Sequence, residues 1–348
     1  MSSRISPKVS IVIPTFNRAS YLPQAVESAL AQDYQDLEVI VSDNASTDDT
    51  PDRAKNYAGN RRFRYFRNNN NIGCVPNYHR PVLEHATGNY YLILSDDDYL
   101  TDAGYISKAV KMIQTDPEIV MVYSQGHILN ENTGEMIQLY LPFREIEDGK
   151  RVFLSRGTVR PMDFTHCNVL FNRDIALSFK PYENEWNLSC DSELFLLMCL
   201  RGKVGVVKDF VSVYRVHSTS MTSRIRKDPR LLINNLEYVL NPYRVALEQG
   251  TISMNDLRKW KERLLMPEVR SALLWCALYH QDASRDLIAA LRDRYPSVID
   301  EIMSGARFRF HYTIANASRA LFWIISGAYR RELSRERRRA RQPKEKRT

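Results

Sequence analysis

The sequence predicts an α/β protein with a mostly parallel, doubly wound sheet flanked by helices, followed by a helical C-terminal extension. Short apolar runs alternate with helical patterns through residues 1–125, as in successive β-α-β units. From about residue 228 onward the pattern is helical. With 348 residues, 44% of them apolar and 26% charged, the chain is long and apolar enough to fold around a sizeable core.

The first four strands are expected where β-branched and aromatic residues cluster: Val9–Ile13, Leu37–Ser42, Phe63–Phe66 and Tyr90–Leu94. Helices are expected over Ser20–Ala31 with Ser20 as N-cap, from Asp48 with Pro51 in the first turn, and after Gly73. Because a helix connects each strand to the next, the strands are expected to run parallel.

Residues 126–225 are less periodic and are expected to complete the sheet domain. They contain two short β-type runs and one apolar helical stretch: Val204–Val207, Val211–Arg215 and Asp191–Leu200. Residues 226–329 form the predicted helical region. Its prolines are expected to divide it into several helices: Pro229, Pro242, Pro267 and Pro296.

The net charge of +8 is concentrated at the C-terminus. Residues 330–348 contain ten Lys or Arg and three Glu, so the rest of the chain carries about +1. We expect this basic tail to be disordered. A non-catalytic nucleic-acid-binding protein using the tail is the least favoured function, because the near-neutral body offers no basic stripe for phosphates. No nucleic-acid partner is expected.

The five cysteines are odd in number and include no Cys-x-x-Cys pair, which predicts reduced and mostly buried thiols. The N-terminus has no apolar signal region, and no run reaches the roughly 18 apolar residues needed to span a bilayer. We therefore expect a cytoplasmic protein.

A polar cluster follows each of the first four predicted strands. The clusters are Pro14–Asn17, Asp43–Ser46, Asn68–Asn71 and Ser95–Asp98. In an open parallel sheet the ligand crevice lies beyond the carboxyl ends of the strands. The four clusters are therefore expected to converge on one site.

The last of these clusters contains three adjacent carboxylates, Asp96, Asp97 and Asp98. Neighbouring carboxylates repel one another, and a hard divalent cation relieves that repulsion. A solvated acidic turn that caps the next helix is the alternative. Dinucleotide, P-loop, zinc-protease and α/β-hydrolase motifs are absent, which disfavours those chemistries.

Four motifs together resemble the family 2 glycosyltransferases of GT-A fold, which have a Rossmann-like sheet. The matching segments are Val9–Asn17, Leu37–Thr50, Asn71–Gly73 with Asn77, and Ala86–Asp98. The resemblance implies inverting transfer of a sugar from a nucleoside diphosphate, with UDP favoured, to a hydroxyl of a saccharide or lipid-linked saccharide in polysaccharide or cell-envelope glycan biosynthesis. It also implies a catalytic domain over residues 1–225, with a nucleotide-sugar half at 1–125 and an acceptor half at 126–225.

The resemblance assigns donor binding to one group of residues: Thr15, Asn17, Asp43, Arg67, Asn71 and Asp96. Thr15 and Asp43 would hold the base and ribose, with the Asp43 carboxylate accepting an imide N–H. The alternative for Asp43 is a turn or helix cap. Arg67 and Arg215 would contact phosphate or base.

The resemblance also implies Mn²⁺ or Mg²⁺ bound through a D-x-D element. The commonest family pattern aligns Ser95 with its first Asp and Asp97 with its second, although Asp96-x-Asp98 also satisfies the element. Asp97 is the expected principal ligand, with Asp98 next and Asp96 supporting. His217, in a Tyr-Arg-x-His element, would complete the metal shell or contact the diphosphate. The alternative for His217 is a structural role.

Asp191 is the predicted general base, in the position where the family places Asp at the start of a helix. Cys190 stands where the family usually has Glu. Glu193 is the second candidate for the base, and the alternative for Asp191 is helix capping. A sugar-nucleotide nucleotidyltransferase is the alternative enzyme, although Pro14–Arg18 lacks the glycine-rich loop such enzymes use.

Residues 308–329 are apolar and aromatic and precede the basic tail. This order is typical of an interfacial helix with a polybasic anchor, so residues 308–348 predict peripheral association with the inner face of the plasma membrane. A core helix followed by a disordered tail is the alternative.

Overall fold

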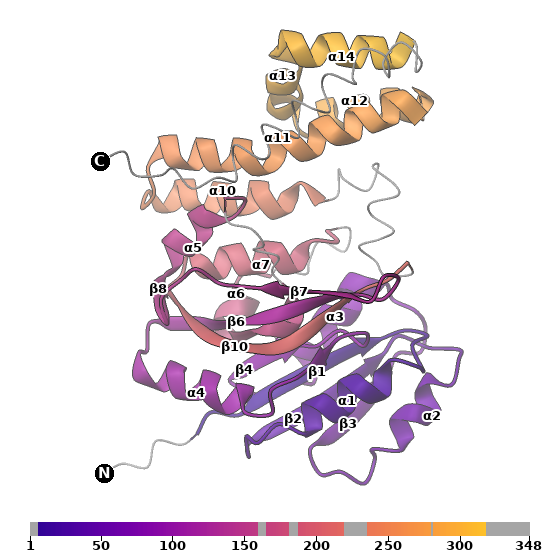
Figure 1. The fold of residues 1–348 in the computed structure, drawn as a ribbon, viewed down its shortest axis with the longest axis vertical. Helices are drawn as coiled ribbons and strands as arrows, with labels where there is room; N and C mark the ends of the chain where they lie inside the picture. The colour runs from indigo at the N-terminus through magenta and orange to yellow at the C-terminus, as the bar shows by residue number, and fades with distance from the viewer. Residues whose placement is uncertain (1–5, 159–164, 181–186, 219–234, 280, 318–348) are drawn as a thin grey trace.

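The computed structural model describes residues 6–158, 165–180, 187–218, 235–279 and 281–317 (Figure 1). Its strands are β1 Val9–Thr15, β2 Leu37–Asp43, β3 Phe63–Arg67, β4 Tyr90–Ile93, β5 Tyr99–Leu100, β6 Ile119–Asn130, β7 Glu135–Leu139, β8 Ile146–Asp148, β9 Val169–Asn172 and β10 Lys203–Val216. Its helices are α1 Leu22–Leu30, α2 Thr50–Lys55, α3 Cys74–Glu84, α4 Tyr105–Thr115, α5 Gly149–Ser155, α6 Arg173–Ser178, α7 Cys190–Cys199, α10 Glu237–Gln249, α11 Met254–Tyr279, α12 Gln281–Arg294, α13 Pro296–Ser304 and α14 Ala306–Ala317. A short 3-10 turn, His166–Asn168, precedes β9.

One sheet organises the fold, in the order β3-β2-β1-β4-β9-β6-β10-β5. The first four strands of this order are parallel, which confirms the prediction for the N-terminal half. The second half is mixed: β9 is antiparallel to β4 and β6, whereas β6 and β10 are parallel. The two short strands expected between residues 204 and 215 are one long strand, β10, whose ladder with β6 is interrupted by register shifts.

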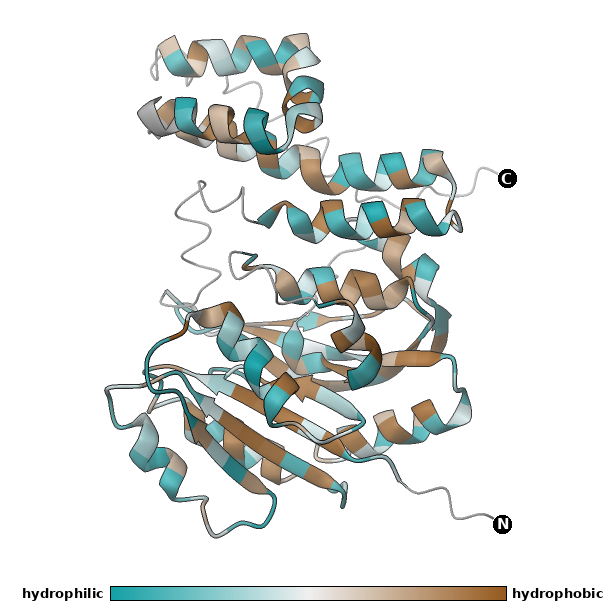
Figure 2. Cartoon of the chain, turned by 180° about the vertical axis from the view of Figure 1, so that it is seen from behind, coloured by the Kyte–Doolittle hydropathy of each residue, from teal (hydrophilic) through white to brown (hydrophobic). Residues whose placement is uncertain are grey.

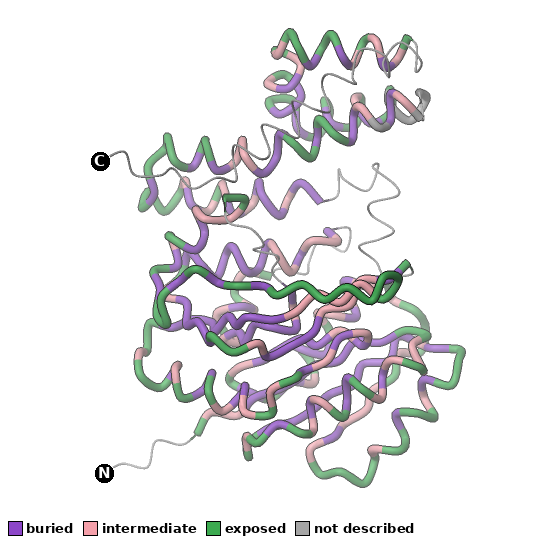
Figure 3. The backbone as a smooth tube through the Cα atoms, viewed as in Figure 1, coloured by how far each residue is buried: buried purple, intermediate pink, exposed green. Residues whose placement is uncertain are grey.

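Helices cover both faces of the sheet (Figures 1 and 2). Apolar residues of α1 and α4 pack with one face of β1 and β2 in one buried cluster. A second cluster joins the opposite face to α3, α5, α6 and α7 and continues into the C-terminal helices. The apolar strands are therefore buried from both sides, as Figure 3 shows for the centre of the sheet.

Two expectations about helix boundaries are wrong. Tyr21, not Ser20, precedes α1, and no side chain caps that helix. Pro242 and Pro267 lie inside α10 and α11 instead of dividing them. Proline removes one backbone hydrogen bond, and tertiary packing of both helices tolerates that loss. Pro51 and Pro296 do lie in first turns, as their fixed φ favours.

The C-terminal helices continue the core of the sheet domain. Helices α10 and α11 lie between α7 and the α12–α14 group (Figure 1). Trp260 of α11 is fully buried, stacks on Phe153 of α5 and donates a 2.8 Å hydrogen bond to its carbonyl. This part of the chain is thus packed directly onto the layer that carries α7.

The predicted membrane segment is described only as far as residue 317. Phe308 of α14 is buried in the main core, whereas Phe310 is exposed. None of the described helices is both long and apolar enough to cross a bilayer. The predicted basic tail lies outside the described residues. The five cysteines are free and four are buried, which confirms the prediction of core thiols.

Candidate functional site

Strand register places three predicted donor-binding residues side by side at the carboxyl edge of the sheet. Thr15 is the register partner of Asp43 across β1 and β2, and Asp43 is the partner of Arg67 across β2 and β3. Parallel strands of matched length bring their final residues to the same edge. The convergence predicted from the polar clusters therefore holds for these three strands.

The Asp43 carboxylate is fully buried and well supplied with donors. Its Oδ1 accepts from the Ser46 backbone N–H at 2.8 Å, and its Oδ2 accepts from the Tyr65 hydroxyl at 2.6 Å. The Arg67 guanidinium adds an ion pair at 3.1 Å and also donates to the Ser46 carbonyl. Asp43 thus makes the turn contact that was its alternative role, and Tyr65 is a partner that the sequence did not reveal.

Asn17 ties the loop after β1 to the loop after β2. Its φ is 54°, a conformation that Asn tolerates better than most residues. Its backbone N–H donates to Ser46 Oγ at 2.9 Å, and its Oδ1 accepts from the Thr47 N–H at 2.7 Å. Phe16, next to it, leaves 41% of its surface exposed at the end of β1.

A buried asparagine, Asn44, organises the loop that contains Asn71. The Asn44 amide donates to Asn71 Oδ1 and to the Gly73 carbonyl, both at 2.9 Å. Its Oδ1 accepts from Asn68 Nδ2 and from the Ile72 N–H. Asn71, predicted to bind the donor, is therefore held by Asn44. The sequence marked this asparagine-rich stretch as polar but gave Asn44 no role.

The acidic turn after β4 brings together Asp97 and His217, two of the three predicted metal ligands. Asp97 Oδ2 lies 2.8 Å from His217 Nε2, and the Asp97 side chain is 15% exposed. Asp98 instead turns inward, where its Oδ1 accepts from the Arg215 backbone N–H at 2.8 Å. Asp96 is also buried.

Burial shifts two of these carboxyls toward the protonated form. It raises the pKa of Asp96 to about 7, and the charge of Asp97 adds to the shift. The same two causes raise the pKa of Asp98 well above its ordinary value. The predicted repulsion within the triplet is therefore present in the structure.

Asp97 and His217 offer an oxygen and a nitrogen donor to a divalent ion, although in this structure the two side chains hydrogen-bond to each other. Among the described residues, no group of three or more His, Cys, Asp and Glu side chains has the geometry of a metal site. Two ligands on adjacent corners of an octahedron, with bonds of about 2.1 Å, lie about 3 Å apart, close to the observed separation. Ions of this kind often take one or two protein ligands and complete their shell with substrate phosphates and water.

Arg215 holds the acidic turn instead of pointing into open space. Its guanidinium donates to the Asp97 carbonyl at 3.0 Å, donates to Gln24, and pairs with Glu131 at 3.1 Å. It also lies over the Tyr99 ring. In this arrangement Arg215 links the turn to α1 and to the end of β6, and phosphate contact is not its present role.

Asp191 occupies the first turn of α7. Its Oδ1 accepts from the Ser192 N–H at 2.7 Å, and Ser189, not Asp191, is the N-cap residue. Burial raises the pKa of the Cys74 thiol to about 12, with further contributions from Asp96, Asp191 and Asp97. The Cys74 thiol therefore lies near enough to Asp96, Asp97 and Asp191 for their charges to affect its pKa.

Glu193, the second candidate for the base, points away from the crevice. Its carboxylate accepts from the side-chain amides of Asn187 and Asn241, the latter on α10. Burial raises its pKa to about 7. This expectation is therefore not supported, because helical geometry puts Glu193 on the face of α7 that packs against the C-terminal helices.

Two further side chains line this region without any signal in the sequence. The Tyr78 ring stacks on His166 with centroids 5.3 Å apart, and the Tyr78 hydroxyl lies 3.2 Å from Ser95 Oγ. Burial lowers the pKa of His166, and the nearby Asp191 charge opposes that shift. Tyr78 therefore connects His166 to Ser95, which begins the acidic turn.

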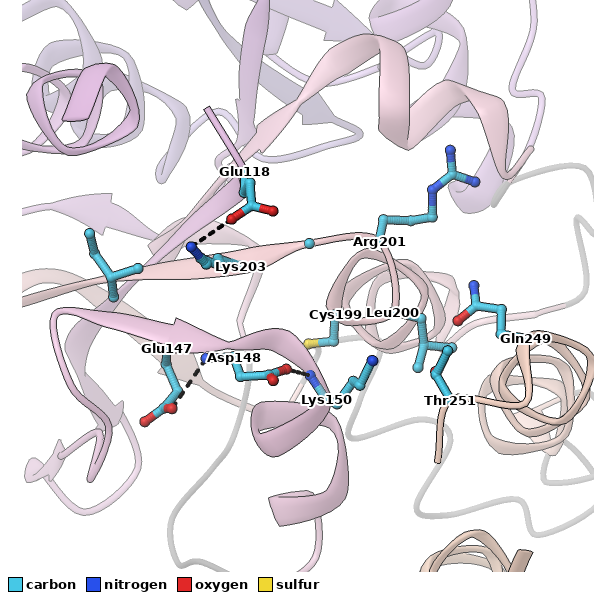
Figure 4. Close-up of a pocket in the computed structure, with 12 residues that line it drawn as sticks. Glu118, Glu147, Asp148, Lys150, Cys199, Leu200, Arg201, Lys203, Gln249 and Thr251 are labelled. Atoms are coloured by element: carbon cyan, nitrogen blue, oxygen red, sulfur yellow. Dashed lines mark hydrogen bonds and ion pairs between the residues drawn. The ribbon is translucent and has the colours of Figure 1, made fainter. Parts of the chain in front are cut away.

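A separate pocket lies at the amino end of β10, away from the acidic turn (Figure 4). Lys203 pairs there with Glu118 at 2.6 Å, and the backbone N–H of Lys150 donates to Asp148 at 2.8 Å. The acidic turn lies at the opposite end of the same strand, where His217 follows β10 and contacts Asp97. The pocket is thus distinct from the candidate active site.

Comparison with known proteins agrees with this geometry. Residues 10–177 match the family model described as "Glycosyl transferase family 2". A segment of 152 residues is 30% identical to the GalNAc(5)-diNAcBac-PP-undecaprenol beta-1,3-glucosyltransferase of Campylobacter jejuni, covering 42% of this chain and 48% of that protein. The chain therefore spans about half the length of this curated relative.

Solved structures share the fold over most of the chain. Staphylococcus aureus TarS 1–349 in complex with UDP-GlcNAc aligns with a TM-score of 0.62 and 17% identity, covering 93% of this chain and 92% of that one. A Pyrobaculum calidifontis mannosyltransferase in complex with GDP-Man and Mn²⁺ aligns with a TM-score of 0.51 and 19% identity, covering 90% and 87%. The sheet and its flanking helices define a GT-A type of fold. Residues 10–177 are similar to glycosyl transferase family 2, and the glucosyltransferase relative agrees with that similarity.

Proposed function

We propose that this protein is an inverting glycosyltransferase that moves a sugar from a nucleoside diphosphate, with UDP favoured, to a hydroxyl of a saccharide or lipid-linked saccharide. One observation carries the proposal. The acidic turn follows β4, which pairs with β1, so it lies next to the edge where Thr15, Asp43 and Arg67 are in register. Donor and metal functions are therefore proposed to share this edge of the sheet, with Asp191 of α7 completing the site.

The donor base is proposed to bind at the carboxyl ends of β1 to β3. The exposed ring of Phe16 offers a stacking surface there, and Thr15 and Asp43 offer polar contacts. Because the Asp43 side chain is fully buried and paired with Arg67, contact with an imide N–H requires the Arg67 guanidinium to move aside. The UDP-GlcNAc complex of a protein with the same fold supports a uridine donor.

Asp97 and His217 are proposed to hold Mn²⁺ or Mg²⁺, with Asp98 and Asp96 supporting the turn. A carboxylate oxygen and an imidazole nitrogen suit Mn²⁺ well. When bound, such an ion neutralises the charge that grows on the leaving diphosphate. The mannosyltransferase that shares the fold was solved with Mn²⁺. Arg215 keeps Asp97 in place through its backbone carbonyl.

Asp191 is proposed to remove the proton of the acceptor hydroxyl. As the acceptor oxygen forms its bond to the anomeric carbon, the bond from that carbon to the diphosphate breaks. The proton passes to the Asp191 carboxylate, the nucleoside diphosphate leaves, and the anomeric configuration inverts. No pairing of Asp191 with a basic side chain is present among the described contacts, so its carboxylate is available as a base.

The acceptor is proposed to be part of a polysaccharide or cell-envelope glycan, and its attachment to a lipid is supported by the name of the Campylobacter relative. A chain that acts on such an acceptor would work at the inner face of the plasma membrane. The exposed Phe310 ring on α14 is the described residue available for that contact. Flotation with anionic vesicles tests this location, and recovery of the full chain only in the soluble fraction would exclude it.

A thermal-shift titration with UDP, GDP and dTDP, each with and without Mn²⁺, tests the donor assignment. A ligand that binds only the folded state raises the melting temperature. We expect a Mn²⁺-dependent rise with UDP in the native protein and no such rise in Asp97→Asn. Arg258→Gln, which alters an exposed ion pair on α11, is the matched control. The absence of a shift with every nucleotide would overturn the donor assignment.

A further inference from the structure

The first turn of α7, which carries Asp191, is held by a buried hydrogen-bonded cluster that reaches the C-terminal helices. Glu193 is 6% exposed, and its two carboxylate oxygens accept from different amides. Asn187 Nδ2 donates to Oε2, and Asn241 Nδ2 of α10 donates to Oε1. One side chain therefore joins the segment before α7, the helix itself and α10.

Asn187 links the same cluster to the start of the helix. It is fully buried; its Oδ1 accepts from the Ser189 N–H at 3.2 Å, and its carbonyl accepts from the Cys190 N–H at 3.1 Å. The Ser189 side chain makes no capping bond. The N-terminal amides of a helix need partners outside the helical ladder, and here Asn187 supplies acceptors for the N–H groups of Ser189 and Cys190.

We propose that Asn187, Glu193 and Asn241, named here the α7 latch, are positioning residues that hold Asp191 at the distance and angle needed to take the acceptor proton. This inference rests on the proposed function, since Asp191 acts there as the base. It also gives the C-terminal helical region a part in the reaction, because Asn241 belongs to α10. The latch touches neither donor nor metal ligands in the described contacts.

The geometry explains why a positioning role suits Glu193. Asp191 and Glu193 are two residues apart on a helix, so their side chains project in different directions. Glu193 faces α10, where the Asn241 amide donates to it, so Asp191 projects from another face of α7. A helix end that loses its partners frays, and an error of about 1 Å in the position of a reacting group costs about 10²-fold in rate.

The test compares Asn241→Ala, Glu193→Ala and Glu193→Gln in the full chain. Asn241→Ala removes only the bond to α10, and we expect kcat to fall about tenfold or more while the donor KM changes less than twofold. Glu193→Ala removes both amide contacts and should lower kcat further. Glu193→Gln should restore most of the rate, because the Asn241 amide can turn to accept from the new Gln nitrogen.

Tyr238→Phe is the matched control. It removes the 2.9 Å hydrogen bond from Tyr238 to Glu268, which joins α10 to α11 and leaves the latch intact. We expect lower stability but an unchanged kcat. If Tyr238→Phe lowers kcat as much as Asn241→Ala does at a similar loss of melting temperature, the latch has only a structural role and the proposal is overturned.

Hydrogen exchange over residues 187–200 supplies a readout that does not need activity. We expect faster amide exchange in this segment for Asn241→Ala than for the native protein or Tyr238→Phe. Unchanged exchange, or faster exchange with unchanged kcat, would overturn the inference. If the native protein transfers no sugar, the proposed function fails, while the exchange comparison still shows whether Asn241 holds the first turn of α7.

Discussion

Two groups of buried carboxylates, one on β2 and one after β4, differ in their supply of hydrogen-bond donors. Glu38 accepts from the Ser10 hydroxyl, from Thr87 and from Arg64. These donors lower its pKa to about 2 despite its burial. In the acidic turn, burial and the Asp97 charge instead raise the pKa of Asp96 to about 7. The donors around Glu38 therefore outweigh its burial, whereas burial and the neighbouring charge dominate for Asp96.

Under the proposed function, this difference corresponds to a structural role for Glu38 and a ligand-binding role for the acidic turn. A carboxylate surrounded by donors is fixed in place and stabilises the fold. A carboxylate that is buried with few donors gains most from a cation, which suits a site that binds a metal and a diphosphate. Asp43 resembles Glu38 because several donors surround its carboxylate. It lies at the carboxyl edge of the sheet, so we expect it to stabilise the loops of the proposed donor site as well as to contact the donor.

The largest effect on activity is expected at Asp191, which lies on α7 and therefore belongs to neither group. Asp191→Asn should lower kcat by about 10² to 10⁴-fold, since an amide cannot take the acceptor proton. The donor-dependent thermal shift should remain. Steady-state kinetics with a fixed donor measures the change. A native rate in Asp191→Asn would exclude it as the base, and Asp174→Asn, at an exposed position on α6, is the control.

Glu38 is expected to make stability depend on pH. Its pKa is about 2 in the folded protein against an ordinary 4.5, so its contribution is fully present above about pH 4.5 and is lost as the pH falls toward 2. The contribution is about 3 kcal/mol. Urea unfolding at pH 7 and pH 3 should show a stability difference between native protein and Glu38→Gln that shrinks on acidification.

Glu84→Gln is the control for this experiment. It removes an exposed carboxylate paired with Arg80 on the same helix, and such pairs contribute little. Its stability should follow the native curve at both pH values. A constant difference between native protein and Glu38→Gln across this range would mean that Glu38 does not ionise below its ordinary pKa.

The donor half of the site was predictable from sequence because its geometry is local. Each strand ends in its own polar cluster, and parallel register alone brings Thr15, Asp43 and Arg67 together. The side chains that hydrogen-bond to these residues were not predictable from the sequence. Tyr65 lies two residues before Arg67, so it reaches Asp43 from the same side of β3, but no motif marks it.

The other half of the candidate site, around the acidic turn, depends on contacts between residues far apart in the chain. Asp97 meets His217, which is 120 positions later, and Asp98 bonds to the Arg215 backbone. Pattern reasoning named Asp97, Asp98 and His217 but could not tell which carboxylate turns inward. That choice follows from β10 running past the acidic turn and supplying a backbone donor. The antiparallel strand β9 was missed for the same reason, since its partners β4 and β6 are remote in sequence.

A smaller effect is expected at Asn44, whose side chain holds the loop of residues 68–73 by hydrogen bonds. Asn44→Ala removes four hydrogen bonds and leaves backbone groups of residues 72 and 73 without these partners. We expect a loss of about 2 kcal/mol in the free energy of unfolding, since unsatisfied buried groups cost about 1 to 3 kcal/mol each and water replaces part of the loss. Denaturant unfolding measures it. Asn60→Ala, in an exposed turn, should change stability by less than about 0.5 kcal/mol.

The smallest effect is expected for Tyr65→Phe, which removes one donor from the buried Asp43 carboxylate. Burial and the bond to Asp43 raise the pKa of the Tyr65 hydroxyl, so it stays a neutral donor at physiological pH. We expect a loss of about 1 kcal/mol in the free energy of unfolding. Tyr57→Phe removes the same kind of bond, 3.0 Å long, to the exposed carboxylate of Glu27. Because water replaces that bond, Tyr57→Phe should cost less than Tyr65→Phe in parallel urea titrations. Equal losses would mean that burial of the carboxylate does not decide the strength of its donors, and the distinction between the two groups of carboxylates would not hold.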